Sequence, residues 1–82
     1  MKYRIVIEKR ARKFIRKQPA DQIRRIMTAL AGLPEQGDIK AMKGAPDVFR
    51  LRVGDYRILF KVEHELLTVI VIDAGNRGQI YK

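Results

Sequence analysis

The spacing of apolar residues changes along this chain, and each change marks a new element. Near the N-terminus, Tyr3, Ile5 and Ile7 alternate with other residues, and this period of two predicts a first strand. From residue 9 the spacing becomes helical, Pro19 divides this region into two helices, and Gly32 ends the second. We expect the two short helices to form a hairpin. Their apolar stripes comprise Ala11, Phe14, Ile15, Ile23, Ile26, Met27, Leu30 and Leu33.

Strand-like alternation returns in the second half of the chain. Three strands are expected at roughly residues 48–53, 56–63 and 67–74, and short turns at 54–55 and 63–65 would join them into an antiparallel meander. The apolar run from 66 to 72 is typical of a strand in the middle of a sheet or covered on both faces. Residues 34–47, with two prolines, two glycines and few large apolar side chains, are expected to be a connecting loop.

The order of these elements predicts an α+β fold. A small antiparallel sheet of about four strands would carry the N-terminal helical hairpin on one face, in the order β-α-α-β-β-β. The 82 residues are expected to form a single domain over positions 1–82. A chain of this length buries only about 60–65% of its unfolded surface, which is enough for one modest core.

The chain is strongly basic, with 18 Lys and Arg against 9 Asp and Glu and a formal net charge of +9. This imbalance indicates a polyanionic or acidic partner, such as RNA, DNA or an acidic protein segment, although charge also confers solubility. Cysteine is absent, and no metal-ligand spacing or glycine-rich phosphate loop is present, so we expect no metal and no cofactor. No secretion signal or membrane-length apolar run is found, so we expect a cytoplasmic protein without membrane contact.

The basic residues of the expected meander are placed regularly. Arg50 and Arg52 alternate with apolar residues, and Arg57 follows the turn, so one face of the sheet should be core and the other cationic. A plainer interpretation is a solvated strand face for Arg50 and Arg52, and an ion pair to Asp55 or Asp73 for Arg57. His64, the one histidine, is expected in a surface turn at the far end of these strands, and Asp73 is expected to pair with a nearby arginine.

The first helix carries like charges three and four residues apart. Such pairs cost roughly 0.2–0.5 kcal/mol each in water, whereas a polyanion would make the arrangement favourable through counterion release. We therefore predict that this helix binds a polyanion, most simply RNA. A merely solvated face and contact with an acidic protein partner are the alternatives. The residues concerned are Lys9, Arg10, Arg12, Lys13, Arg16 and Lys17.

Three short segments, in this order, carry a family resemblance. They are Gly44-Ala45-Pro46-Asp47 before a strand, Gly54-Asp55-Tyr56-Arg57 into the next strand, and Gly75-Asn76-Arg77 near the end. With the order of elements, they make nearly the whole chain resemble the RelE-type toxins of the RelE/ParE superfamily. The resemblance implies a ribosome-dependent endoribonuclease that cuts messenger RNA in the ribosomal A site without a metal. It also implies a RelB-like antitoxin as partner, and operator DNA bound only through the antitoxin complex.

The resemblance also implies the site. The basic site of the family falls on Arg57, Arg77 and Tyr81, where the residue types match, and on Arg50 and Arg52, where RelE has lysines. Arginine can clamp phosphate but is a poor general base, so the base is open: a Tyr81 phenolate, or a group of the ribosome or RNA. Many family members have a further helix after the tyrosine, whereas this sequence ends at Lys82, which is expected to leave a more open site or a groove for the antitoxin.

Two other functions fit the same features. A toxin like the ParE branch shares the fold and inhibits DNA gyrase by binding, without nuclease activity. A catalytically silent chain could act only as the co-repressor partner of an antitoxin. Arg57, Arg77 and Tyr81 favour the nuclease, because a toxin that acts only by binding has no need of this cluster.

Overall fold

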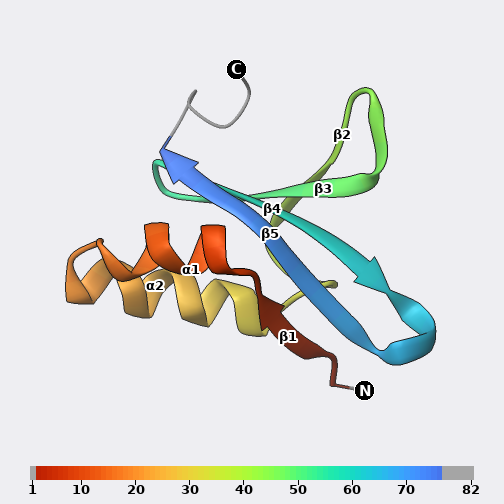
Figure 1. The fold of residues 1–82 in the computed structure, drawn as a ribbon, viewed down its shortest axis with the longest axis horizontal. Coiled ribbons are helices and arrows are strands. Elements are labelled where there is room, and N and C mark those ends of the chain that lie inside the picture. Colours follow the sequence, from red (N-terminus) through yellow and green to blue (C-terminus); the bar gives the residue numbers. More distant parts are fainter. Residues whose placement is uncertain (1, 77–82) are drawn as a thin grey trace.

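The fold was analysed in a computed structural model that describes residues 2–76. Two helices follow the first strand, and the other strands follow the helices (Figure 1). The elements are β1 (Arg4–Ile7), α1 (Lys9–Arg16), α2 (Ala20–Ala31), β2 (Asp38–Met42), β3 (Ala45–Val53), β4 (Tyr56–Glu63), the 3-10 turn η1 (His64–Leu66) and β5 (Thr68–Asn76). The expected α+β class and the helical hairpin are confirmed.

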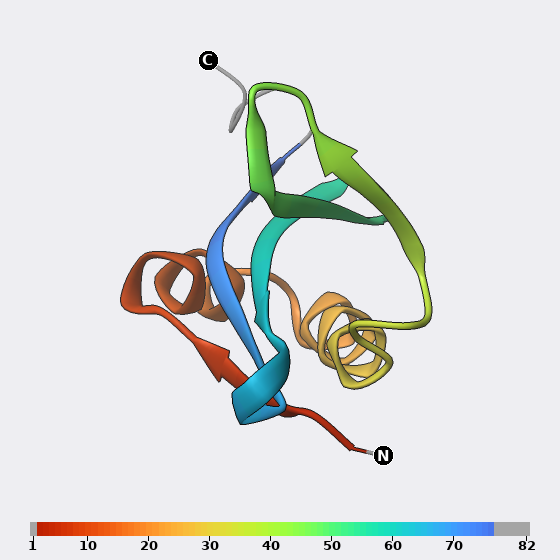
Figure 2. The ribbon, with the colours of Figure 1, turned by 90° about the vertical axis from the view of Figure 1, so that its right-hand side faces the viewer.

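The strands form one mixed sheet of five, in the order β1-β5-β4-β3-β2. Strands β2 to β5 pair antiparallel with their neighbours, as expected, but β1 pairs parallel with β5. Strand β5 therefore has a neighbour on each side, which explains its nearly continuous apolar sequence. In Figure 1 both helices lie on one side of β4 and β5, and the β2–β3 hairpin projects away from them. In Figure 2, turned by 90°, α1 and α2 are seen to the left and right of these two strands.

The expectation of a loop over residues 34–47 was wrong. Residues 38–42 form the extra strand β2, and β3 begins at Ala45 rather than at residue 48. Gly37 (φ 122°) and Gly44 (φ 81°) adopt backbone conformations that other residues rarely reach, and they bracket the strand. The hairpin therefore extends the sheet by one strand beyond the four expected.

The core lies between the helices and one face of the sheet. Ile26 and Leu30 of α2 and Ile58 and Phe60 of β4 are each at most 1% exposed. Burying side chains of this size contributes about 1.5–3 kcal/mol each. Met27, expected in the apolar stripe of α2, is instead 44% exposed. The buried apolar residues are Ala11, Ile15, Ile26, Leu30, Leu33, Leu51, Val53, Ile58, Phe60, Val69, Val71 and Ala74.

A bulge in β5 determines which of its side chains face the core. Phe60 pairs with Val71 and its neighbour Leu59 pairs with Asp73, so Ile72 is the extra residue. Val71 and Asp73 are two residues apart and would share a face in a regular strand. Because of the bulge, Val71 faces the core beside Phe60, while Asp73 lies on the opposite face beside Leu59.

Candidate functional site

The face of the sheet opposite the core carries a cluster of charged side chains. Residues directly paired across strands share a face, so the register defines two rows that run across the sheet. One row is Asp38, Arg52, Arg57 and Gly75, and the other is Lys40, Arg50, Leu59 and Asp73. We call this surface the cationic face. The expected separation of an apolar and a basic face in β3 and β4 is thus observed.

Arg57 lies in the middle of its row and is buried. The residue is only 7% exposed, and its Nη1 atom has no hydrogen-bond partner among the described residues. Neither Asp55 nor Asp73 forms an ion pair with Arg57 in the described part of the chain. Asp73 instead lies 3.6 Å from Nε of Arg10 and accepts a hydrogen bond from the Ala74 amide at 2.9 Å. Asp73 therefore pairs with an arginine as expected, but that arginine belongs to α1.

Arg50 and Arg52 share one carboxylate. Nε of Arg52 donates to Oδ2 of Asp38 at 2.9 Å, and Nη2 of Arg50 donates to Oδ1 at 3.3 Å. The Nε atom of Arg50 is buried and has no hydrogen-bond partner within residues 2–76. The two arginines do not lie on an edge strand, because β2 covers the outer side of β3. Asp38 thus holds both guanidinium groups side by side.

The unpaired donors indicate what the cationic face can bind. A buried cation without a counterion is costly unless a ligand supplies one. Guanidinium groups bind phosphate and carboxylate oxygens through paired, charge-assisted hydrogen bonds. Nη1 of Arg57 and Nε of Arg50 are buried donors that a bound anion would satisfy. The geometry is therefore suited to an oxyanion such as a phosphate or a carboxylate.

Two of the other predicted site residues, Arg77 and Tyr81, lie outside the described residues. The five basic residues of α1 and Lys17, which follows the helix, are all exposed. His64 lies in the turn between β4 and β5, at the opposite end of β4 from Arg57, and its Nδ1 is hydrogen-bonded to the Tyr3 hydroxyl at 2.9 Å. His64 therefore takes no part in the cationic face.

Asp38 and Lys40 were not among the sequence candidates. Both belong to β2, which was expected to be loop, and the register brings them opposite Arg52 and Arg50. A signal was present: Asp38 and Lys40 flank Ile39, and this short alternation lies between two glycines. Five residues were too few to separate a strand from a polar loop.

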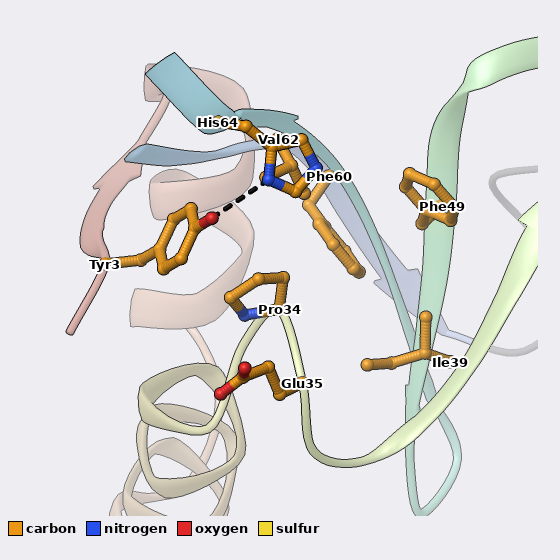
Figure 3. Close-up of a pocket in the computed structure, with 8 residues that line it drawn as sticks. All are labelled: Tyr3, Pro34, Glu35, Ile39, Phe49, Phe60, Val62 and His64. Atoms are coloured by element: carbon orange, nitrogen blue, oxygen red, sulfur yellow. Dashed lines mark hydrogen bonds between the residues drawn. The ribbon is translucent and has the colours of Figure 1, made fainter. Parts of the chain in front are cut away.

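An apolar hollow lies on the core side of the sheet, toward the end of β4 that is remote from Arg57. Figure 3 shows Phe49, Phe60 and Ile39 on one side of it and Tyr3 with His64 on another. Its volume is about 280 Å³, and Pro34, Glu35 and Val62 complete its lining. Phe49 and Phe60 stack with their ring centroids 5.6 Å apart. This hollow offers a surface for apolar groups rather than for charged ones.

No group of three or more histidine, cysteine, aspartate or glutamate side chains within residues 2–76 is placed to hold a metal ion. Neither α1 nor α2 is long and apolar enough to cross a membrane.

The family follows from comparison with known proteins. A model of the family described as the ParE toxin of the type II toxin–antitoxin system parDE matches residues 3–81. The chain belongs to the RelE/ParE toxin superfamily. The resemblance inferred from the sequence is confirmed, and the toxin is of the RelE type. The RelE1 protein of Methanocaldococcus jannaschii is 27% identical over 88 residues, covering 100% of this chain and 98% of that protein.

Solved structures of toxin–antitoxin complexes have the same fold. The archaeal RelE–RelB complex from Pyrococcus horikoshii OT3 gives a TM-score of 0.77 at 28% identity, covering 96% of the toxin and 99% of the matched chain. The intact RelBE complex of Escherichia coli gives 0.76 at 27% identity, covering 94% and 99%. The toxin is therefore the RelE-like component of a type II toxin–antitoxin module.

Proposed function

We propose that this toxin is an endoribonuclease that cleaves messenger RNA in the ribosomal A site and so inhibits translation. One observation carries the proposal: the buried guanidinium of Arg57 has an unpaired donor in the centre of a face that also holds Arg50 and Arg52. A phosphodiester supplies the missing acceptors. RNA also brings its own nucleophile, the 2'-hydroxyl, so the protein needs to position the phosphate, stabilise its developing charge and move protons.

The proposed site combines described residues with two that the resemblance assigns. Arg57 and Arg77 bind the scissile phosphate and stabilise the charge of the phosphorane. Arg50 and Arg52 hold the flanking phosphate charge. Tyr81 stacks on a base or gives a proton to the leaving 5'-oxygen. No step in this scheme requires a metal ion.

Inhibition of gyrase by binding is the competing function, and the matching family model bears the ParE name. The cationic face favours the nuclease. A toxin that acts only by binding a protein gains nothing from a 7% exposed arginine with an unpaired donor, because most of that side chain does not reach the surface. An RNA phosphodiester gains negative charge as the phosphorane forms, and a buried, unpaired guanidinium can stabilise that charge.

Helix α1 is proposed to contact ribosomal RNA. Its first turn contains no acidic residue, and Lys9, Arg10 and Arg12 lie near the positive end of the helix dipole, which disfavours cations. Within residues 2–76, Arg10 alone among the five basic residues of this helix forms an ion pair, and Lys17, which follows the helix, forms none. The free toxin therefore carries repulsion that a polyanion would relieve.

The contact predicts a change in salt dependence. In the double variant Lys13→Gln/Lys17→Gln, the slope of log K for ribosome binding against log salt should flatten by roughly 1–2, because up to two phosphate contacts are lost. Lys2→Gln/Lys43→Gln is the matched control, with the same change of charge at two exposed lysines away from α1. Filter binding of radiolabelled toxin to ribosomes between low and physiological salt measures the slope. Equal slopes for the two variants would contradict a role for α1.

The partner is proposed to be a RelB-like antitoxin. The matched structures from P. horikoshii and E. coli are complexes of RelE with RelB. An amphipathic antitoxin segment could place apolar side chains in the hollow of Figure 3 and acidic side chains near the basic surfaces. Binding of operator DNA is expected only through this complex.

The nuclease is tested directly with programmed ribosomes. Purified toxin is incubated with them and, separately, with the same naked messenger, and cleavage ends are mapped by primer extension beside Arg77→Ala. We expect cuts in the A-site codon only when ribosomes are present, and none with the variant. A folded toxin that arrests growth without cutting would refute the proposal, and a gyrase supercoiling assay would then test the ParE-like alternative.

A further inference from the structure

We propose that Asp38 is the general base of the cleavage reaction. This inference rests on the proposed nuclease function and adds the proton acceptor that the sequence left open. Asp38 lies on β2 at the end of the row that contains Arg52 and Arg57. It also pairs directly with the two arginines proposed to hold phosphate.

Few groups on the cationic face can accept a proton. Arginine keeps its proton in proteins, so Arg50, Arg52 and Arg57 cannot serve. Asp73 is held by Arg10 and by the Ala74 amide, and its side chain is 21% exposed. The Asp38 side chain is 49% exposed, so solvent and substrate can reach it. Of the two carboxylates that the register places on this face, Asp38 is the accessible one.

The position of Asp38 relative to the arginines matches what the reaction needs. The attacking 2'-oxygen is on the ribose whose 3'-oxygen carries the scissile phosphorus. The two reacting atoms lie about 3–3.5 Å apart when poised to react. A base must therefore stand next to the groups that bind the phosphate. The Asp38 oxygens are 2.9 Å and 3.3 Å from nitrogens of Arg52 and Arg50. Arg52 is in turn paired across the sheet with Arg57, which is proposed to bind the scissile phosphate. The 2'-hydroxyl beside that phosphate is therefore brought toward the Asp38 carboxylate.

Substrate binding also activates the carboxylate. In the free toxin Asp38 is engaged by Arg50 and Arg52, and Lys40 is the nearest charged residue of its own strand. Phosphate oxygens compete for the same guanidinium donors, which frees a carboxylate oxygen. The carboxylate oxygen is thus free to accept the 2'-hydroxyl proton when RNA occupies the site.

The step balances without a further reactant. The 2'-hydroxyl proton passes to Asp38, the 2'-oxygen forms a bond to phosphorus, and the bond from phosphorus to the 5'-oxygen breaks. The leaving 5'-oxygen takes a proton from water. The products are a 2',3'-cyclic phosphate and a 5'-hydroxyl. Asp38 returns its proton to the solvent, so the toxin is restored.

Asp38→Asn tests the assignment, because asparagine keeps the shape of the side chain and cannot accept the proton. With ribosomes saturated by toxin, the single-turnover cleavage rate should fall about 100-fold, the lower range for loss of a general base. Ribosome affinity should be unchanged or higher, since one negative charge leaves the cationic face. Asp47→Asn, which removes an exposed carboxylate at the start of β3, should cut at the wild-type rate. Far-ultraviolet circular dichroism and thermal melts establish that each variant is folded.

A conservative variant separates a base from a structural brace. Asp38→Glu should regain part of the rate. If wild type cuts and folded Asp38→Asn cuts equally well or faster, Asp38 is not the base and acts instead as an internal competitor of phosphate. If wild type itself does not cut, the nuclease function fails and the assignment fails with it.

Discussion

Arg57→Met should lower the rate of ribosome-dependent cleavage by roughly 1,000-fold, the scale expected when an arginine that stabilises a phosphoryl transition state is removed. Growth arrest on expression should disappear with it. Methionine resembles the arginine stem in length but carries no charge. Arg57 is 7% exposed with Nη1 unpaired, so the substitution removes a desolvated cation rather than a stabilising ion pair. The free energy of unfolding should therefore be unchanged or higher.

Stability and activity are measured on the same preparations, by urea denaturation and by single-turnover cleavage. Arg57→Lys retains the positive charge but lacks the planar guanidinium that can form two parallel hydrogen bonds to a phosphate. Its cleavage rate should therefore lie between those of Arg57→Met and the wild type. Arg24→Ala, at an exposed arginine of α2 without an ion pair in the described chain, is the control for loss of a positive charge. A variant that is less stable by more than about 2 kcal/mol and still cuts normally would show that Arg57 is a structural residue.

The division of the sheet into an apolar and a cationic face could be predicted from the sequence. Alternation has a period of two, so once Leu51 and Ile58 are placed in the core, Arg50, Arg52 and Arg57 must lie on the other side. The helical hairpin could be predicted for a similar reason, because Pro19 and Gly32 interrupt an otherwise continuous helical spacing. These are local rules, and they do not depend on which strands become neighbours.

The features that the sequence did not reveal depend on long-range pairing. Strand β2 is short and contains one large aliphatic side chain, Ile39, so its pairing with β3 rather than its composition makes it a strand. The parallel partnership of β1 with β5 and the bulge at Ile72 are likewise properties of the assembled sheet. Asp38 enters the candidate site only through this pairing, and no local spacing relates it to Arg52, fourteen residues away.

The same strand pairing gives the two faces of the sheet different roles. On the cationic face, some buried guanidinium donors lack hydrogen-bond partners among the described residues, and a bound ligand can supply them. On the other, Ile58 and Phe60 are fully enclosed and contribute stability that offsets the cost of the first face. A substitution in the cationic face should therefore affect activity far more than stability, and a substitution in the core should do the opposite.

Phe60→Ala should produce the largest loss of stability, about 3–5 kcal/mol, the range found when a buried phenylalanine is truncated to alanine. Phe60 is 1% exposed, stacks on Phe49 and pairs with Val71 at the point where β5 bulges. It also lines the 280 Å³ hollow, so truncation would enlarge an existing space rather than open an isolated cavity. Urea denaturation followed by circular dichroism measures the change.

Leu66→Ala is the matched control, because it removes a large apolar side chain that is 72% exposed and should change the free energy of unfolding by less than about 0.5 kcal/mol. Phe60→Leu, which refills most of the space, should fall between the two. If Phe60→Ala costs less than about 1 kcal/mol, the helices and the sheet do not form the single packed core on which the geometry of the cationic face depends. A loss in the expected range ties that geometry to the packing beneath β4, since Arg57 and Phe60 project from opposite faces of the same strand.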